Sequence, residues 1–153
     1  MIKVINVKII VASDNHGDMY SIEKILLTHK DADLYLHAGD SQRMDFEMSP
    51  FRCVKGNNDW GLDYPNSFVV NTPAGKIYVN HGHKILPYNF YELKNQGVKL
   101  IIRGHSHVRK IEEREGVYIV NPGSTSRPRD GSRGTYLVIM INDNKFDFTF
   151  KEI

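Results

Sequence analysis

Residues 5–17, INVKIIVASDNHG, join a nearly continuous apolar run to a cluster of polar side chains. The run Ile5–Ala12 is rich in β-branched residues, which is typical of a central strand covered on both faces. It ends just before Asp14 and His16, and Gly17 then allows the chain to turn at once. Function collects beyond the carboxyl ends of strands in open α/β sheets, so this segment predicts a strand that delivers candidate ligands.

Four further clusters of the same kind follow along the chain, each at the end of a short apolar run. They are Gly39-Asp40, Gly56-Asn57-Asn58-Asp59, His81-Gly82-His83 and Gly104-His105-Ser106-His107. Carboxylate, imidazole and amide oxygen are ligands of divalent first-row metals, and such metals make water nucleophilic near neutral pH. The five clusters therefore predict a dinuclear metal site, with phosphoester hydrolysis as the reaction to test first.

The spacing inside two of the clusters predicts their local geometry. One residue separates Asp14 from His16, and one residue separates His105 from His107. An extended backbone would direct both members of each pair to the same side. Gly104 would remove a side chain where the backbone has to approach the metals closely. A single aspartate or histidine is more often structural, so the prediction rests on the whole set.

The remaining pattern predicts a layered α/β domain. Asp18 can cap a helix whose apolar residues recur at three- and four-residue spacing. Further strands are expected at Leu34–Ala38, Phe51–Lys55, Lys99–Arg103 and Val117–Val120, with a short helix between Asn89 and Gly97. Hairpins are expected from Ser67–Asn71 with Lys76–Asn80, and from Thr135–Ile141 with Lys145–Ile153, whose phenylalanines alternate with polar residues. The order of strands and helices predicts mixed sheets.

Composition places the chain among globular proteins. It has 153 residues, of which 41% are apolar and 25% charged, and this length favours one domain over residues 1–153. The sequence shows neither an apolar run long enough to span a membrane nor a signal peptide, so a cytoplasmic location is expected by default. The single cysteine, Cys53, cannot form an intramolecular disulfide and is interpreted as a small buried thiol.

Charge and histidine outside the clusters give no further site. The net charge of +2 is too small to indicate nucleic-acid binding, which requires clustered lysine and arginine. Arg127, Arg129 and Arg133 form the one local concentration of positive charge and are interpreted as part of a solvated loop. His29 and His37 are interpreted as structural.

The order of the five clusters resembles the calcineurin-like metallophosphoesterases, whose pattern is D-x-H, G-D, G-N-x-D/E, H and G-H-x-H. The short chain and the turn Asn121-Pro122-Gly123-Ser124 resemble the small single-domain phosphodiesterases of the YfcE type. The resemblance runs from the first strand to this turn. It implies a four-layer α-β-β-α sandwich with two mixed sheets, a detail that periodicity alone does not specify.

The resemblance also implies a ligand set for each of two divalent ions. The first ion would be held by Asp14, His16, Asp40 and His107, and the second by Asp40, Asn57, His81 and His105. Asp40 would thus bridge the ions. Manganese is the first candidate, and nickel, iron, zinc and magnesium stay open because mixed nitrogen and oxygen ligands do not select one metal. His83 stays open between a partner that orients His81 and a substrate contact.

One position departs from the family pattern. Asn58 stands where many members have histidine and the small phosphodiesterases often have cysteine. An amide donates a hydrogen bond but no proton at neutral pH, so we expect Asn58 to bind a phosphate oxygen. Asp59 is expected behind it as an orienting carboxylate, and these two residues are the predicted catalytic pair. Lack of a general acid implies modest activity or a restriction to activated esters.

The implied function is hydrolysis of a small phosphodiester by a hydroxide that bridges the two metals. Monoester hydrolysis is the close alternative, since no single residue selects diesters. A binding scaffold is the alternative from another class, because a eukaryotic retromer subunit resembles this chain through much of its length. That scaffold has asparagine at the position of His16, so His16 favours the enzyme. Self-association stays open, because Tyr88, Phe90 and Tyr91 either line a subunit contact or pack a helix.

Overall fold

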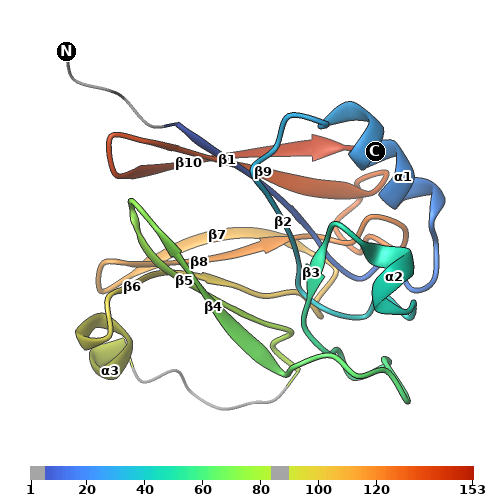
Figure 1. The fold of residues 1–153 in the computed structure, drawn as a ribbon, viewed down its shortest axis with the longest axis horizontal. Coiled ribbons are helices and arrows are strands. Elements are labelled where there is room, and N and C mark those ends of the chain that lie inside the picture. Colours follow the sequence, from blue (N-terminus) through green and yellow to red (C-terminus); the bar gives the residue numbers. More distant parts are fainter. Residues whose placement is uncertain (1–5, 84–89) are drawn as a thin grey trace.

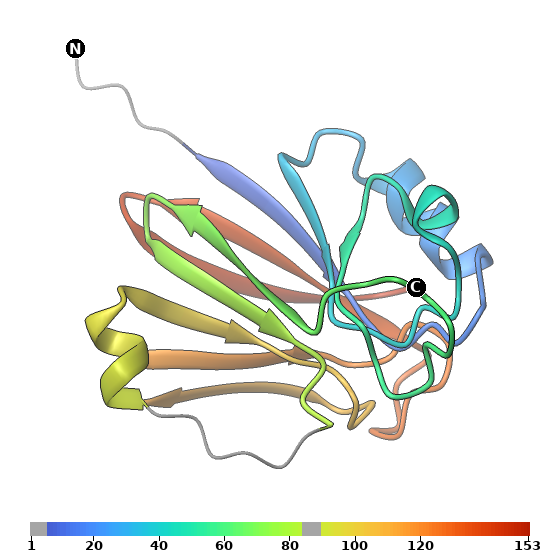
Figure 2. The same cartoon turned by 60° about the horizontal axis from the view of Figure 1, so that its bottom comes forward.

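The computed structural model describes residues 6–83 and 90–153, which form two five-stranded sheets packed face to face (Figure 1; Figure 2). The first sheet has the order β10-β9-β1-β2-β3. Its strands are β1 (Val7–Ala12), β2 (Leu34–His37), β3 (Arg52–Cys53), β9 (Thr135–Asn142) and β10 (Lys145–Glu152). The second sheet has the order β4-β5-β6-β8-β7. Its strands are β4 (Ser67–Thr72), β5 (Gly75–Asn80), β6 (Val98–Ile102), β7 (Arg109–Arg114) and β8 (Val117–Pro122).

Both sheets are mixed, as predicted. In the first sheet β1 pairs in parallel with β2 and antiparallel with β9. In the second sheet β6 pairs in parallel with both β5 and β8. The edge strands are antiparallel, since β4 pairs with β5 and β7 pairs with β8. The carboxyl ends of β1, β2, β5 and β6 consequently lie toward the same edge of the molecule (Figure 1).

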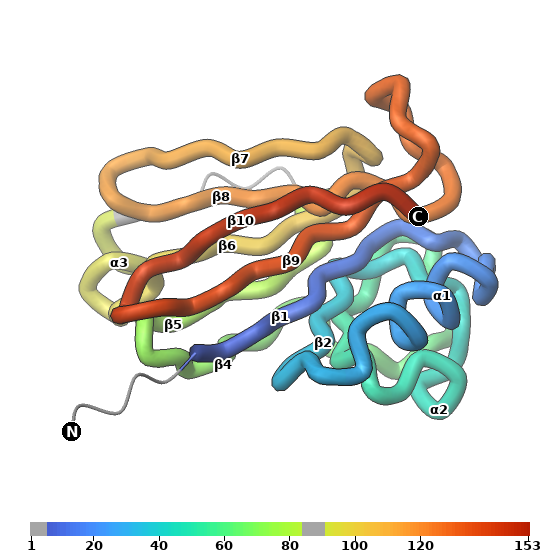
Figure 3. The backbone as a smooth tube through the Cα atoms, turned by 90° about the horizontal axis from the view of Figure 1, so that it is seen from above, coloured from blue at the N-terminus to red at the C-terminus, as the bar shows by residue number. Residues whose placement is uncertain are grey.

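Helices cover the outer sides of the two sheets. α1 (Tyr20–Thr28) and α2 (Asp45–Met48) lie beside β1 and β2 (Figure 3), and α3 (Phe90–Asn95) lies on the side of the second sheet that faces away from the first (Figure 1). Leu93 of α3 packs against the outer face of that sheet. The four-layer α-β-β-α sandwich is therefore confirmed, with α3 as the helix of the fourth layer within the described residues.

The central strand β1 explains the apolar run that opens the sequence. Ile9 and Val11 pack into the core between the two sheets, whereas Ile10 and Ala12 pack on the other face beneath Ile22 of α1. These four side chains of β1 are fully buried. Burial of a side chain of the size of isoleucine or valine stabilises the fold by about 1.5–3 kcal/mol, so the part of a strand that is covered on both faces is expected to be apolar.

The predicted elements differ from the observed ones mainly at their ends. α1 begins at Tyr20, and the side chain of Asp18 accepts a hydrogen bond of 3.0 Å from the backbone N–H of Ser21. The predicted strand at 99–103 lies at Val98–Ile102. β10 has alternating half-buried and exposed residues, as its spaced phenylalanines predict.

Two elements, α2 and β7, do not follow from the sequence pattern. α2 is a single turn of four residues. β7 is an edge strand of mostly charged residues, and its one apolar side chain, Ile111, is 43% exposed. Neither element buries enough apolar surface to leave a periodic signal.

Some predictions fall on parts of the chain outside the described residues. These are the start of the first strand at Ile5, the helix start at Asn89, and the side chains of Tyr88 and Phe90. Tyr91 is described and is 76% exposed. Across 6–83 and 90–153, no helix is long and apolar enough to cross a lipid bilayer.

Candidate metal centre

The five predicted clusters meet at one edge of the molecule, where loops from both sheets converge. The loops that follow β1, β2 and β3 carry Asp14, His16, Asp40 and Asn57. The loops that follow β5 and β6 carry His81, His105 and His107. There are two groups of side chains in which all the ligand atoms lie within 4.8 Å of one another. They are Asp14 with His16 and His107, and Asp14 with Asp40 and His81. Asp14 belongs to both groups.

Short distances connect the two carboxylates to the imidazoles. His107 Nε2 lies 3.3 Å from Asp14 Oδ1, and His81 Nε2 lies 3.3 Å from Asp40 Oδ2. Asn57 Oδ1 lies 3.0 Å from His81 Nε2 and 3.2 Å from His105 Nδ1. Asn57 and His105 thus join the edge of the cluster, while their role as ligands stays a prediction.

Backbone carbonyls orient two of the histidines. His81 Nδ1 donates to the carbonyl oxygen of Ala38 at 2.7 Å, and His107 Nδ1 donates to that of Arg127 at 2.6 Å. A carbonyl oxygen can only accept, so in the neutral ring the lone pair is on Nε2. Both Nε2 atoms face the carboxylates. This is the arrangement in which outer partners orient histidines that bind a metal.

The cluster contains more acceptors than donors. Asp14 is fully buried, and its Oδ1 has no hydrogen-bond donor among the described residues. His16 Nδ1 contacts Gln42 Oε1 at 2.7 Å, and His16 Nε2 lies 3.2 Å from His107 Nε2. Two lone pairs at that distance repel unless a cation or a proton compensates them. The side chains present therefore fit a divalent cation.

The carboxylates and the histidines of the cluster shift one another's pKa values. Burial lowers the pKa of His81, but the hydrogen bond that its protonated ring donates to Asp40 and the charges of Asp14 and Asp40 outweigh burial and raise the pKa above the ordinary value. The contact with Asp14 raises the pKa of His107. Burial raises the pKa of Asp40, yet hydrogen bonds from His81 and Asn58 bring it well below its ordinary value. Burial raises the pKa of Asp14, but its contacts with His107 and His81 outweigh burial and lower it, so both carboxylates are held in the ionised form that binds cations.

The backbone of the cluster is not extended, contrary to the expectation for the paired ligands. Asp14, His16, Asp40, His105 and His107 all have φ between 44° and 74°. This left-handed region costs an ordinary residue about 1–2 kcal/mol. Contacts between loops hold it, since the N–H groups of Asp14 and His16 donate at 3.0 Å to the carbonyls of Gly39 and Asp40.

Two glycines make the close packing of these loops feasible. A Cβ atom on Gly56 would lie 2.1 Å from Asp40 Oδ1, and one on Gly104 would lie 2.1 Å from Ser13 Oγ and 2.5 Å from Asp14 Oδ2. The predicted close approach at Gly104 is therefore an approach to the side chains that hold Asp14. Ser13 itself donates to Asp14 Oδ2 at 2.5 Å.

Asp59 lies behind Asp40 and binds backbone N–H groups. Its Oδ2 accepts from the N–H of Asp40 at 2.9 Å and of Gly56 at 2.7 Å, and its Oδ1 accepts from the N–H of Gln42 at 2.8 Å. Asp59 is 1% exposed. It positions the loop that carries Asp40, as an orienting carboxylate would.

Asn58 lies at the front of the cluster. Its backbone N–H donates to Asp40 Oδ1 at 2.8 Å, and its side-chain amide donates to Asp40 Oδ2 at 2.9 Å. In this structure the side-chain amide of Asn58 thus donates to Asp40, and phosphate binding by Asn58 stays a prediction.

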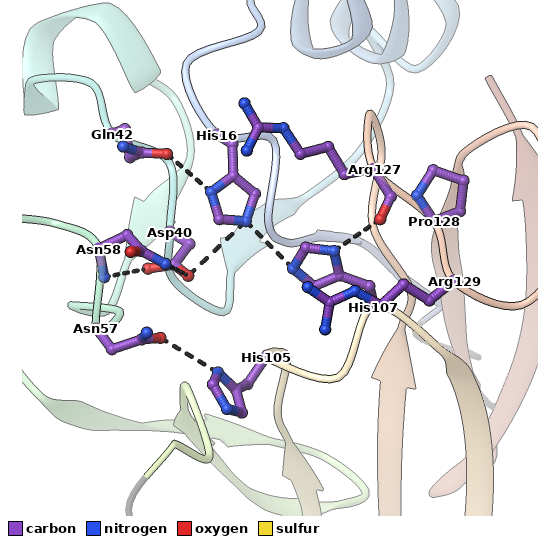
Figure 4. A pocket seen from close by; sticks show the side chains of 10 residues that line it. All are labelled: His16, Asp40, Gln42, Asn57, Asn58, His105, His107, Arg127, Pro128 and Arg129. Atoms are coloured by element: carbon purple, nitrogen blue, oxygen red, sulfur yellow. Dashed lines mark hydrogen bonds and ion pairs between the residues drawn. The ribbon is translucent and has the colours of Figure 1, made fainter.

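A cleft of about 640 Å³ opens in front of these side chains (Figure 4). It is lined by His16, Asp40, Gln42, Asn57, Asn58, His105, His107, Arg127, Pro128 and Arg129. Four of these, Gln42, Arg127, Pro128 and Arg129, are absent from the predicted site. The signal that could have found the arginines is the Asn121-Pro122-Gly123-Ser124 turn just before them, because Ser124 Oγ donates to the backbone carbonyl of Asp14 at 2.7 Å.

The remaining histidines lie around the cluster. His83 is in ring contact with His81, at 5.2 Å between centroids, and lines a neighbouring hollow together with Asn57. His37 is fully buried, burial lowers its pKa to about 4, and its Nε2 lies 2.8 Å from Asn15 Oδ1. His29 Nε2 lies 2.7 Å from the hydroxyl of Tyr136.

Removal of divalent metal is expected to lower the melting temperature, because the convergent acceptors and two carboxylates then repel one another. The stabilisation by a bound ion grows with its free concentration and reaches about 2.7 kcal/mol at 100 times Kd. Thermal unfolding after chelation, followed by titration with manganese, measures this effect. A melting curve that is unchanged after verified metal removal would contradict the metal assignment.

The chain is similar in sequence to known phosphoesterases. The model of the calcineurin-like phosphoesterase superfamily domain matches residues 7–144. The probable metallophosphoesterase YsnB of Bacillus subtilis is 29% identical over 144 residues, which cover 89% of this chain and 85% of that protein. The phosphodiesterase YfcE of Escherichia coli is 25% identical over 173 residues, which cover 89% of this chain and 93% of that protein.

Solved structures share the fold. A conserved protein of Streptococcus pneumoniae, described as a predicted phosphoesterase, is similar with a TM-score of 0.83 and 31% identity, over 97% of this chain and 90% of that chain. Vacuolar protein sorting 29 of Cryptosporidium parvum is similar with a TM-score of 0.70 and 16% identity, over 97% of this chain and 98% of that chain. The second likeness concerns the fold alone.

Proposed function

Because the chain belongs to the calcineurin-like phosphoesterase superfamily, we propose that it is a divalent-metal-dependent phosphodiesterase that acts as one domain on a small substrate. The observation that carries the proposal is the convergence of acceptors at the strand ends. The Nε2 atoms of His81 and His107 face the carboxylates of Asp40 and Asp14, and the buried Oδ1 of Asp14 lacks a donor among the described residues.

We propose a dinuclear centre with the ligands that the family pattern implies. One ion would be held by Asp14, His16, Asp40 and His107, and the other by Asp40, Asn57, His81 and His105. When bound, such ions supply Lewis acidity and make water nucleophilic near neutral pH. Two carboxylates cancel only part of the charge of two dications, so the cleft would attract an anion. Manganese is the first candidate, with nickel, iron, zinc and magnesium as alternatives.

Asn58 and Asp59 have different roles in this proposal. Asn58 lines the cleft and carries the side-chain N–H groups that would bind a phosphate oxygen. Asp59 is a positioning residue, because it accepts from the backbone N–H groups of Asp40 and Gly56 rather than from the cleft.

Diester hydrolysis is distinguished from its alternatives by substrate and metal. We expect bis(p-nitrophenyl) phosphate to be hydrolysed with a higher kcat/KM than p-nitrophenyl phosphate, and the rate to depend on added manganese, nickel, iron, zinc or magnesium. A preference for p-nitrophenyl phosphate would instead identify a monoesterase. Metal-loaded protein that hydrolyses neither ester would favour a binding scaffold.

His16 supports the enzyme over the scaffold. Its Nε2 lies 3.8 Å from both Asp14 Oδ1 and Asp40 Oδ2, so its side chain faces the two carboxylates together. Asparagine, the residue of the retromer scaffold at this position, would replace the imidazole by a weaker metal ligand.

Asn58→His is expected to raise activity toward alkyl phosphodiesters more than toward p-nitrophenyl esters. Histidine can protonate a leaving alkoxide, whereas a nitrophenolate leaves without a proton, and general-acid catalysis typically contributes roughly a hundredfold or more. The measurement compares kcat/KM for both ester classes in the native protein and the variant, with metal content verified.

Asn58→Ala is the control for this substitution, because it removes the side-chain amide without supplying a proton donor. It should lower the rates of both ester classes. Equal rate changes for alkyl and nitrophenyl esters in Asn58→His would show that the proton of the leaving group comes from elsewhere.

A further inference from the structure

The segment after β8, residues 123–134, is fixed against the loops that carry the candidate ligands. Ser126 Oγ donates to the carbonyl of Asn15 at 2.8 Å, and the N–H of Arg127 donates to Ser124 Oγ at 2.8 Å. The N–H of Arg129 donates to the carbonyl of His107 at 2.9 Å. The backbone at both arginines is therefore held in place by the same loops that form the candidate metal centre.

The side chains of Arg127 and Arg129 lie at the wall of the cleft. Figure 4 shows Arg129 reaching past His107 into the cleft and Arg127 lying beside His16. Among the described residues, neither guanidinium has a carboxylate within 4 Å. Arg109, by contrast, is paired with Asp130 on the same segment at 2.9 Å. The loop thus neutralises one arginine and directs two others to the cleft with their charge available.

Charge and size of the cleft indicate what these arginines bind. Asp40 is the one carboxylate among the residues that line it, and the candidate metal ions would already match its charge. A volume of about 640 Å³ exceeds what a phosphodiester group needs and lies in the usual range of sites for whole small molecules. Guanidinium groups bind phosphate through paired, charge-assisted hydrogen bonds.

We propose that Arg127 and Arg129 bind a second phosphate of the substrate, so that the preferred substrate is a phosphodiester that carries an additional phosphate group. This inference rests on the proposed phosphodiesterase function. In the proposed function the reacting phosphoryl group would bind at the ligand cluster and Asn58, whereas both arginines are exposed. Their position suits a group beyond the one that reacts.

The test compares two esters with the same leaving group, thymidine 5′-(p-nitrophenyl phosphate) and its 3′-phosphorylated form. The native protein is expected to show a kcat/KM roughly tenfold or more higher for the 3′-phosphorylated ester. Charge-assisted hydrogen bonds to a phosphate group contribute an effect of about this size. In the Arg127→Ala/Arg129→Ala double variant this ratio should fall to near one. Added salt should reduce the ratio in the native protein, because the contacts are solvent-exposed.

Arg133→Ala is the matched control. Arg133 lies on the same segment and is exposed, but it does not line the cleft, so its replacement should leave the ratio unchanged. A second readout is calorimetric binding of thymidine 3′,5′-bisphosphate against thymidine 5′-monophosphate, which should favour the bisphosphate in the native protein and not in the double variant.

Each outcome decides one of the two proposals. Equal kcat/KM for the two esters in the native protein, or a ratio that survives in the double variant, would overturn the role of the arginines while leaving the phosphodiesterase intact. Equal losses of kcat/KM on both esters in the double variant would indicate that the arginines bind the reacting phosphoryl group. That result would also overturn their proposed role in binding a second phosphate. Absence of hydrolysis would count against the phosphodiesterase, and the binding comparison would then decide on the arginines.

Discussion

Asp40→Asn is expected to abolish hydrolysis and to lower the metal content, while the fold survives. Asparagine has nearly the same shape, but it removes the negative charge that lies 3.3 Å from His81 Nε2 and that we assign to both ions. It also places an amide where the carboxylate now accepts two hydrogen bonds from Asn58. Loss of an outer partner of a metal ligand already costs roughly 10–100-fold, so loss of a bridging ligand should exceed about a hundredfold.

Three measurements check this result: turnover of bis(p-nitrophenyl) phosphate, metal equivalents per chain, and circular dichroism for the fold. Asp143→Asn, in the exposed turn between β9 and β10, is the matched control and should leave all three unchanged. His107→Ala and His105→Ala should each reduce the metal content, at different sites. Near-native turnover with two metals bound in Asp40→Asn would refute the assignment.

Asp59→Ala is expected to lower the free energy of unfolding by about 3 kcal/mol or more, even without metal. Asp59 accepts hydrogen bonds from the buried backbone N–H groups of Asp40 and Gly56 and from the partly buried N–H of Gln42. Each buried donor left without a partner costs roughly 1–3 kcal/mol. Chemical unfolding in the presence of a chelator measures this contribution separately from that of the metal.

Asp63→Ala provides the comparison for Asp59→Ala, since Asp63 is exposed four residues further along the same loop. Surface substitutions of this kind usually change stability by no more than about 0.5 kcal/mol. If both variants unfold with the same free energy as the native protein, the hydrogen bonds of Asp59 do not hold the loop of Asp40.

The strands of the core could be predicted from the sequence because their burial leaves a pattern. Residues 9–12 of β1 are covered on both faces and form a continuous apolar run, and the phenylalanines of β10 alternate with exposed residues. α2 and β7 carry no such signal, since one is a single turn and the other is a charged edge strand. Their positions depend on neighbours that are distant in the sequence.

The site shows the same division between what local pattern reveals and what it does not. Asp14, Asp40 and His81 could be predicted as candidate ligands from their residue types and from their positions after apolar runs. The left-handed backbone at Asp14 and His16 could not be predicted, because it is stabilised by hydrogen bonds to Gly39 and Asp40 on another loop. The position of the arginines at the cleft cannot be predicted for a similar reason, since Ser124 and Ser126 bring their loop against residues more than a hundred positions earlier.

The origin of the cluster in both sheets has a consequence for the order of events during folding. His16 and His107 face each other at 3.2 Å although 91 positions separate them in the chain, and Asp40 and His81 likewise come from different sheets. Contacts between such distant residues close large loops and form late. We expect a newly made chain to bind the proposed ions only after residue 107 has emerged and the sheets have stacked. Metal uptake would then be the last step of folding, and stopped-flow measurements during refolding would show it after the sheets have formed. Bound metal would in turn slow the first step of unfolding.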